Sequence, residues 1–394
     1  MPDKKVLLRC AEAIVDCMDI RKEDTVLLGG GEHSLKLFDQ VRSLISRIGA
    51  VQNLYLLTDE YGRNLFQDTH ISIETLEKTP LYFDYLKEKA TMFIYTDWFS
   101  DPSILSEAPK EKRVAWSKAK APIRQLLHHG INLEDTIGER KNVKWLYFYW
   151  PSEAFAKFNN IEYQALEQTV VNGITVKKDL LNQNAQKLMN KLENIAKLHV
   201  SDEYGSDFWI STKHRPIYKE IGRIACEQRG VNLPAGEIYL PPIETKGEGV
   251  LFCPITNDKK SNKIIRNVEL PFKNGQLELD KVSADCNLDA LIDSFQQCEQ
   301  LDRENKNIKT LRTYNIGEFG LGINPNIKQA IGYQLIDEKI YSAVHLAFGW
   351  NDSFGGTSIS DMHWDFVSSP QCTINAEYLD GSQKTIMEKG VIMA

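Results

Sequence analysis

The sequence predicts an α/β N-terminal domain with a parallel sheet, followed by a strand-rich α+β C-terminal domain. Two patterns predict this architecture. In the first half of the chain, segments with apolar residues at helical spacing alternate with short apolar runs typical of buried strands. In the second half, Gly and Pro become frequent and separate segments of β type. A chain of 394 residues exceeds what one core usually supports, so we expect two domains, residues 1–185 and 186–394.

The first domain is expected to begin with alternating helices and strands. Gly29, Gly30 and Gly31 end the first strand and predict a tight turn, because GGGEH matches neither the dinucleotide-binding fingerprint nor the P-loop. The strand expected at 144–150 has aromatic side chains on both faces, which predicts burial in a sheet or at a subunit interface. The expected elements are helices at 5–18 and 34–48 and strands at 25–29, 51–57, 92–96 and 144–150.

A long helix is expected to link the two domains. Residues 176–198 contain neither Gly nor Pro, and Lys, Asn and Leu dominate this stretch. The strands expected beyond it lie at 249–253, 264–270, 341–348 and 373–378.

Charge and composition exclude several classes of protein. The net charge of −7 and the pI of about 5.7 argue against a nucleic-acid-binding protein, which needs a basic surface. No stretch approaches the roughly 20 apolar residues that span a bilayer, and no apolar leader follows MPDKK, so we expect a cytoplasmic protein. The seven cysteines include no C-x-x-C pair, which argues against both a disulfide framework and a cysteine-ligated zinc.

Metal-binding residue types gather in the last third of the chain. Glu318, His345, His363 and Asp365 combine imidazole with carboxylate, the ligand mix of zinc, iron, cobalt and manganese sites. On an extended segment His363 and Asp365 point to the same side, so both can reach one ion. A pair of loop-connected strands would bring His345 to them. Singly, either histidine could instead be a buried structural imidazole, and Glu318 a turn or cap residue.

Four ordered strings in this region resemble the aminopeptidase T family of thermophilic metallo-aminopeptidases. They are NLPAGEIYLPP from Asn232, IGEFGLGINPNI from Ile316, DEKIYSAVHLAFG from Asp337 and DMHWDFV from Asp361. The resemblance is strong from about residue 230 onward and faint before it.

This resemblance implies a site for divalent metal, with two ions of Zn, Co or Mn. The positions that match the family's ligands are Glu237, Glu318, His345, His363 and Asp365, with Glu318 as the candidate bridge between the ions. Paired ions would polarise a scissile carbonyl and lower the pKa of a shared water. The resemblance also implies a homodimer.

One family position departs from the pattern. The tyrosine that the family places seven residues after its first histidine ligand falls at Asp352, and an ionised carboxylate can only accept a hydrogen bond or bind metal. Tyr314 is a possible replacement donor, although core packing is the alternative for it. The expected catalytic residues are therefore Glu318, Asp352 and Tyr314. The carboxylate that recognises a substrate α-amino group would come from Glu237, Asp352 or Asp361.

Three classes of function remain open from the sequence. The first is a metallo-aminopeptidase acting on peptides. The second is other metal chemistry on a specialised small molecule, including a ring-cleaving dioxygenase of the 2,5-dihydroxypyridine type, in which His345, His363 and Asp365 would hold a single Fe(II). The third is a non-catalytic binding protein with a vestigial site. His33, after the glycine run, is a further candidate for substrate contact.

Overall fold

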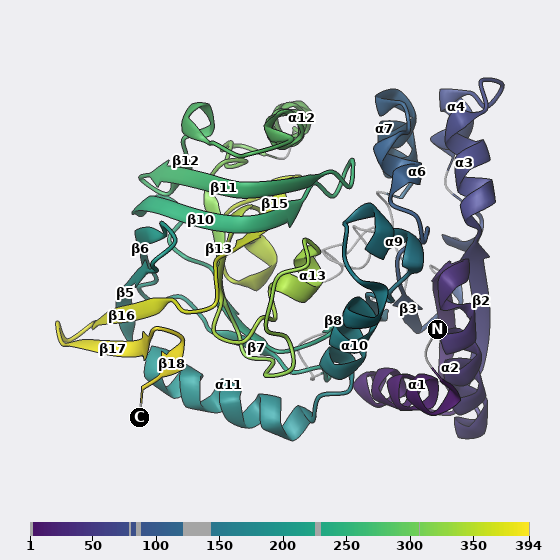
Figure 1. Ribbon diagram of the computed structural model, residues 1–394, viewed down its shortest axis with the longest axis horizontal. Helices are drawn as coiled ribbons and strands as arrows, with labels where there is room; N and C mark the ends of the chain where they lie inside the picture. The colour runs from purple at the N-terminus through teal and green to yellow at the C-terminus, as the bar shows by residue number, and fades with distance from the viewer. Residues whose placement is uncertain are drawn as a thin grey trace. The chain divides into compact units, whose positions relative to one another are not determined.

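A computed structural model describes residues 3–393 except 79, 84–87, 121–142, 225–229 and 307 (Figure 1). The chain divides into two compact units. The first comprises residues 1–175, 222–235 and 260–262, and the second comprises residues 176–221, 236–259 and 263–394. The predicted combination of a parallel sheet with antiparallel, strand-rich structure is confirmed.

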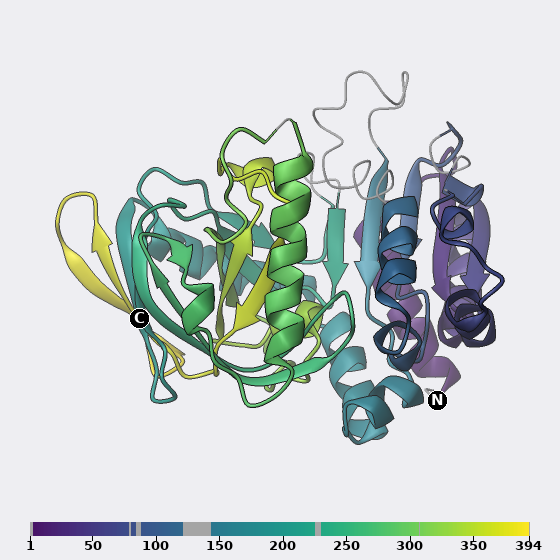
Figure 2. The same ribbon diagram turned by 90° about the horizontal axis from the view of Figure 1, so that it is seen from above.

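The first unit is built on a five-stranded parallel sheet with the order β2-β1-β3-β4-β8. Its strands are β1 (Thr25–Gly31), β2 (Val51–Leu57), β3 (Met92–Tyr95), β4 (Lys144–Phe148) and β8 (Gly230–Leu233). The helices packed around it are visible in Figure 2. They are α1 (Lys4–Met18), η1 (Glu32–Ser34), α2 (Leu35–Ile48), α3 (Asp59–Gln67), α4 (Ile73–Leu76), α6 (Ser103–Ser106), α7 (Lys110–Ala119), α9 (Glu153–Phe158) and α10 (Tyr163–Ile174).

The glycine run is strand rather than turn, so the prediction of a tight turn at Gly29–Gly31 is wrong. All three glycines belong to β1 and pair with β2. A Cβ at Gly30 would lie 2.5 Å from Cγ2 of Thr96, and one at Gly29 would lie 2.9 Å from the Trp98 ring. The close approach of these side chains to the backbone explains the glycines.

The second unit contains two antiparallel sheets. The eight-stranded sheet has the order β12-β11-β10-β6-β5-β16-β17-β18, and the five-stranded sheet has the order β15-β14-β13-β9-β7. The strands of the larger sheet are β5 (Ile195–Ser201), β6 (Asp207–Ser211), β10 (Gly247–Asn257), β11 (Ile264–Lys273), β12 (Gln276–Leu277), β16 (Thr373–Tyr378), β17 (Gln383–Glu388) and β18 (Val391–Ile392). Those of the smaller sheet are β7 (Tyr218–Glu220), β9 (Glu237–Leu240), β13 (Ile316–Gly322), β14 (Val344–Gly349) and β15 (His363–Val367).

Helices complete the second unit, namely α11 (Lys178–Leu192), η2 (Leu279–Lys281), α12 (Leu288–Glu304), α13 (Gln334–Asp337) and η3 (Asp352–Phe354). Apolar side chains of the larger sheet, such as Leu251 and Val268, share one core with Leu346 and Phe366 of the smaller sheet. Burying each such side chain contributes about 1.5–3 kcal/mol. Phe295 of α12 extends this core. One face of the five-stranded sheet is therefore committed to packing, and its other face is available for a site.

The long helix is shorter than predicted. Helix α11 ends at Leu192, and residues 195–198, expected to be helical, begin strand β5 instead. Asn194 adopts a left-handed conformation with φ of 59° and turns the chain. Ile195 and Leu198 then join the core, so tertiary packing overrides the local helix preference.

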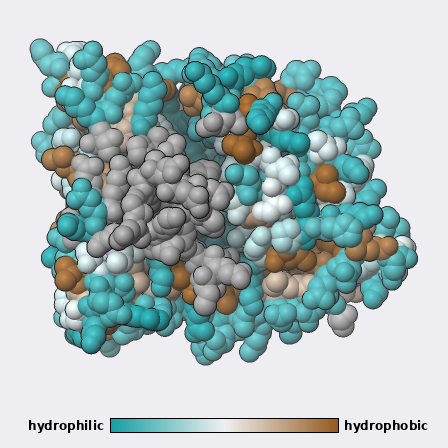
Figure 3. Space-filling view, turned by 180° about the vertical axis from the view of Figure 1, so that it is seen from behind, coloured by the Kyte–Doolittle hydropathy of each residue, from teal (hydrophilic) through white to brown (hydrophobic). Residues whose placement is uncertain are grey.

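Hydrophilic residues predominate on the face drawn in Figure 3, and apolar residues form small separate patches. Among the described residues, no helix is long and apolar enough to cross a membrane.

Candidate metal centre

The alternation of side chains along the five-stranded sheet places all five predicted ligands on one face. His363 and Asp365 alternate with Trp364, which points to the opposite face and is buried in the core. Strands β14 and β15 pair antiparallel, which confirms the strand pair predicted to bring His345 toward them. Glu318 lies on β13, opposite Ala347 of β14.

Small residues form the floor beneath these ligands. Gly320 lies opposite both His345 on β14 and Tyr239 on β9, and Gly322 lies opposite Glu237. A Cβ at Gly320 would overlap the imidazole of His345, so that ring lies directly against the backbone of β13. The absence of side chains here provides the space that the ligands surround.

Glu318 stands between the two histidines. Its Oε1 lies 3.5 Å from Nε2 of His345, and its Oε2 lies 3.5 Å from Nε2 of His363. Two groups of possible ligands result, and both contain Glu318. The first adds Glu237 and His345, and the second adds His363 and Asp365.

The spacing of these atoms fits metal coordination. Oε2 of Glu237 lies 3.5 Å from Nε2 of His345, and Oδ2 of Asp365 lies 3.5 Å from Nε2 of His363. Two ligands of one tetrahedral ion, each at about 2.1 Å, would be separated by about 3.4 Å. Oε2 of Glu237 and both ring nitrogens of His345 are buried without a hydrogen-bond partner among the described residues. Buried carboxylate oxygen and imidazole nitrogen atoms of this kind fit the coordination of a cation.

The protonation of the ligands is strongly perturbed. Burial lowers the pKa of His345, but Glu318 and Glu237 outweigh it and raise that pKa to about 9. Burial likewise opposes the protonated form of His363, whereas Asp365 and Glu318 raise its pKa to about 9. Burial raises the pKa of Asp365 to about 7, against the effect of His363. Protons thus supply part of the positive charge that the carboxylates require.

His363 is oriented by the backbone. Its Nδ1 lies 2.9 Å from the carbonyl oxygen of Trp350, which can accept the Nδ1 proton. This contact leaves Nε2 directed toward Glu318 and Asp365. Metal-binding histidines are commonly held by a hydrogen bond to their second nitrogen.

A buried lysine, which sequence reasoning missed, adjoins the first ligand group. Lys339 is fully buried, and its Nζ lies 2.5 Å from Oε1 of Glu237, 3.0 Å from Oε2 of Glu338 and 3.4 Å from Oε2 of Glu220. Burial opposes its charge, but these carboxylates raise the pKa of Lys339 well above its usual value. The only sequence signal was its place within DEKIYSAVHLAFG.

A second missed residue contacts the other ligand group. Gln334 of α13 is buried, and its Nε2 donates to Oδ2 of Asp365. This contact fixes the carboxylate beside His363, as expected of a residue that supports a ligand.

The structure does not bring Tyr314 to the ligands. Its hydroxyl donates to Glu299 at 2.8 Å, and its ring stacks on Phe295 in the core, 5.6 Å between centroids. Burial and the hydrogen bond to Glu299 raise the pKa of Tyr314 well above its usual value. The geometry therefore favours the alternative of core packing for this residue.

Asp352 lies in η3, in the loop between β14 and β15. Its Oδ1 is buried and has no hydrogen-bond partner among the described residues. Two residues later, the ring of Phe354 lies 6.3 Å from that of His363. Asp361, by contrast, is exposed. His33 lies in the first unit, where burial lowers its pKa to about 4.

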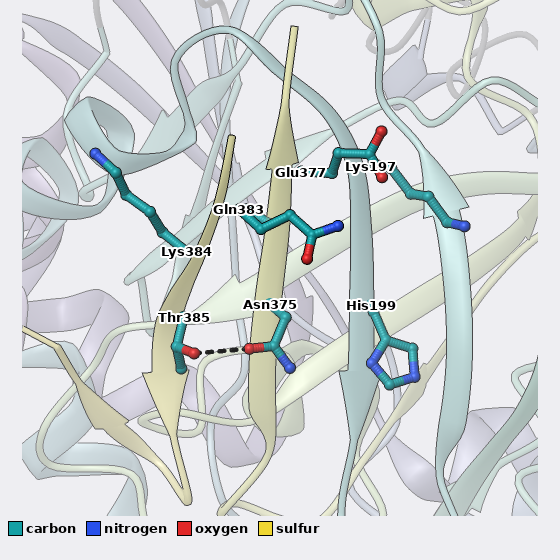
Figure 4. A pocket seen from close by; sticks show the side chains of 8 residues that line it. Lys197, His199, Asn375, Glu377, Gln383, Lys384 and Thr385 are labelled. Carbon is teal, nitrogen blue, oxygen red and sulfur yellow. Dashed lines mark hydrogen bonds between the residues drawn. The ribbon is translucent and has the colours of Figure 1, made fainter. Parts of the chain in front are cut away.

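A groove of about 380 Å³ lies elsewhere in the second unit, over strands β5, β16 and β17 (Figure 4). Its lining contains none of the five ligands. Several of its side chains are already engaged, since His199 lies 2.7 Å from Asp207 and Lys197 lies over the ring of Trp209. The residues that line it are Lys197, His199, Asn375, Ala376, Glu377, Gln383, Lys384 and Thr385.

Comparisons with known proteins place this geometry in context. The profile of a family described as thermophilic metalloprotease (M29) matches residues 3–392. The structure of wild-type AmpT from Thermus thermophilus is similar with a TM-score of 0.69 at 17% identity, covering 99% of this chain and 100% of that chain. A 2,5-dihydroxypyridine dioxygenase from Pseudomonas putida KT2440 has a TM-score of 0.57 at 15% identity, with 100% and 99% covered. A search of curated protein sequences found no match.

Proposed function

Because the chain belongs to the thermophilic metalloprotease family (M29), we propose that it is an aminopeptidase that removes N-terminal residues from peptides and binds two divalent ions. The catalytic part would be the C-terminal half of the chain, since the five proposed ligands lie between residues 237 and 365. When bound, the ions would polarise the scissile carbonyl and provide a nucleophile from water at neutral pH.

The observation that best supports two bound ions is the position of Glu318. Each of its carboxylate oxygens faces a different histidine at 3.5 Å. This arrangement suits a carboxylate that bridges two ions. Glu237 and His345 would complete the first site, and His363 and Asp365 the second.

The charge balance of the site also favours two divalent ions. Five carboxylates and the ammonium of Lys339 leave four negative charges, which two divalent ions would neutralise. With a single ion, two of these charges would have to be balanced by protons on the remaining histidine and carboxylate side chains. The five carboxylates belong to Glu220, Glu237, Glu318, Glu338 and Asp365.

Recognition of the free α-amino group is assigned to Asp352. Of the three predicted candidates, Glu237 already contacts Lys339 through Oε1, and Asp361 is exposed. Asp352 retains a buried oxygen without a hydrogen-bond partner among the described residues, close in sequence to a ring that contacts His363. An ionised carboxylate there would accept hydrogen bonds from the substrate ammonium.

A dioxygenase is the second candidate function, because the fold is similar to that of a ring-cleaving dioxygenase. It would need His345, His363 and Asp365 around one iron. In the described part of the chain, however, the two histidines fall into different ligand groups. Glu237 and Glu318 would also have no role in a single-iron triad.

The test combines metal analysis with two assays on the purified protein. We expect two equivalents of zinc, cobalt or manganese per chain, and release of p-nitroaniline from aminoacyl p-nitroanilides. Blocking the α-amino group of the same substrates by acetylation should abolish release. One equivalent of iron, with oxygen consumption and no aminoacyl cleavage, would overturn the proposal in favour of the dioxygenase.

A further inference from the structure

Four aromatic side chains contact one another in succession beside the proposed ligands. We call these residues, Tyr218, Tyr239, Phe354 and Trp350, the aromatic row. The rings of Tyr218 and Tyr239 stack with centroids 5.4 Å apart, and Tyr239 meets Phe354 edge to face at 5.7 Å. Phe354 in turn meets Trp350 at 5.9 Å. The row ends at His363, whose ring lies 5.4 Å from that of Trp350.

The row begins on the same face of the sheet as the ligands. Tyr239 is two residues after Glu237 on β9, so both side chains project from one face. Tyr218 pairs with Tyr239 from β7, and Gly320 separates Tyr239 from His345 in the register of the sheet. The first two rings therefore adjoin the floor of the proposed metal centre.

Phe354 connects the two sides of the centre. Its ring contacts both Tyr239 of β9 and His363 of β15, which lie on either side of the central strands β13 and β14. All four rings are half-buried rather than enclosed in the core. An apolar surface next to the proposed reaction centre is thus available to a ligand.

The loop that carries Phe354 is held in place from several directions. Asn351 donates from Nδ2 to the carbonyl oxygen of Gly317, directly before Glu318. Oε1 of Glu244 accepts from the backbone of Thr357, and the guanidinium of Arg215 donates to the carbonyl oxygen of Gly355. A surface held this firmly can bind a side chain without a large ordering cost.

We propose that the aromatic row contacts the side chain of the residue that is removed, and that the preferred substrates are peptides with a bulky apolar N-terminal residue. This inference rests on the proposed aminopeptidase activity. Aromatic rings offer a large apolar area and favourable edge-to-face contacts to Leu, Met, Phe or Tyr side chains. An acidic N-terminal side chain would lose hydration and face the electron-rich ring surfaces.

The first test compares p-nitroanilides of phenylalanine, leucine, glycine, aspartate and lysine on the metal-loaded enzyme. We expect kcat/KM for phenylalanine and leucine to exceed that for glycine by about 10- to 100-fold. In Tyr239→Ala and Phe354→Ala this ratio should fall about tenfold. Tyr239→Leu keeps an apolar side chain of similar bulk, so it distinguishes the loss of an aromatic ring from a failure to fold. This variant should retain the preference for leucine and lose the preference for phenylalanine.

Tyr204→Ala is the matched control, because Tyr204 is an aromatic residue of the same unit that is 55% exposed. It should leave the ratio unchanged. Equal kcat/KM for all five substrates would overturn the inference while leaving the aminopeptidase proposal intact. A preference for lysine would also overturn it, because it would indicate recognition of a cation by the rings.

A binding measurement separates failure of this inference from failure of the proposed function. Calorimetry with free L-phenylalanine and glycine should show tighter binding of phenylalanine to the metal-loaded protein, and Tyr239→Ala should remove the difference. If no aminoacyl substrate is cleaved yet this difference is found, the row binds apolar side chains and the proposed reaction is wrong. Equal binding of the two amino acids would overturn the inference whatever the activity.

Discussion

The ammonium of Lys339 lies 2.5 Å from Oε1 of Glu237, while Oε2 of the same carboxylate faces His345 at 3.5 Å. One oxygen of this proposed ligand is thereby occupied by the ammonium group, and only the other would be able to reach an ion. The lysine would limit Glu237 to one coordinating atom, and it supplies part of the positive charge that the neighbouring carboxylates require.

Replacing Lys339 should therefore weaken both the fold and the metal centre. Lys339→Met leaves the buried Glu220 and Glu237 and the partly buried Glu338 without their cation, and we expect the free energy of unfolding to fall by about 3–5 kcal/mol. Chemical denaturation measures this loss. Lys339→Met combined with Glu220→Gln should recover part of the stability, whereas Lys281→Met, at an exposed ion pair, should leave it unchanged. A stable single variant with normal metal affinity would contradict the role assigned to Lys339.

Glu318→Gln should reduce the number of bound ions. The amide keeps the shape of the side chain but offers one weak ligand oxygen instead of two charged ones, so both ligand groups lose their shared member. We expect at most one equivalent of metal by elemental analysis and a loss of kcat/KM of at least about 100-fold. Glu299→Gln, a carboxylate of the same unit that contacts Tyr314, should retain two equivalents.

Metal binding should release protons at neutral pH. In the metal-free protein His345 and His363 have pKa values of about 9, so both are protonated at pH 7. An ion requires their neutral form. More protons are bound without metal than with it, so the apparent affinity should rise with pH and level off above about 9. Calorimetric titrations in buffers of different ionisation enthalpy count the protons, and an enthalpy independent of buffer would refute this expectation.

Asp352→Asn should impair substrate recognition without removing metal. The change deletes the charge expected to accept hydrogen bonds from the substrate ammonium, a contribution of about 1.5–3 kcal/mol. We therefore expect kcat/KM on aminoacyl p-nitroanilides to fall about 10- to 100-fold, with two equivalents of metal retained. The exposed Asp361→Asn is the control and should behave as the wild type. If the two variants were equally active, Asp352 would have no part in amine recognition.

Most of the correct predictions about the site came from the four family-like sequence strings in the second half of the chain. The resemblance that they indicated is confirmed by the family match. The extended His363–Asp365 pair and the neighbouring strand that carries His345 are found as expected. These features follow from the period-two pattern of a strand, which is local in sequence.

Other features depend on contacts between distant segments and could not be predicted from local pattern. Lys339 is a residue type that is almost never fully buried, so only its three carboxylate partners explain its position. The early end of α11 reflects the core contacts of Ile195 and Leu198. Tyr314 lies four residues before Glu318, yet its hydroxyl contacts Glu299 of α12, because proximity in sequence does not determine side-chain direction.

The proposed centre requires a residue without a side chain at position 320, although Gly320 is not one of its ligands. Its missing Cβ is the space in which the His345 ring lies, so even one methyl group there would displace a ligand that is itself unchanged. The centre is thus specified by an omitted atom as well as by the atoms that coordinate. A sequence could keep all five ligands, gain an alanine on β13, and lose the site.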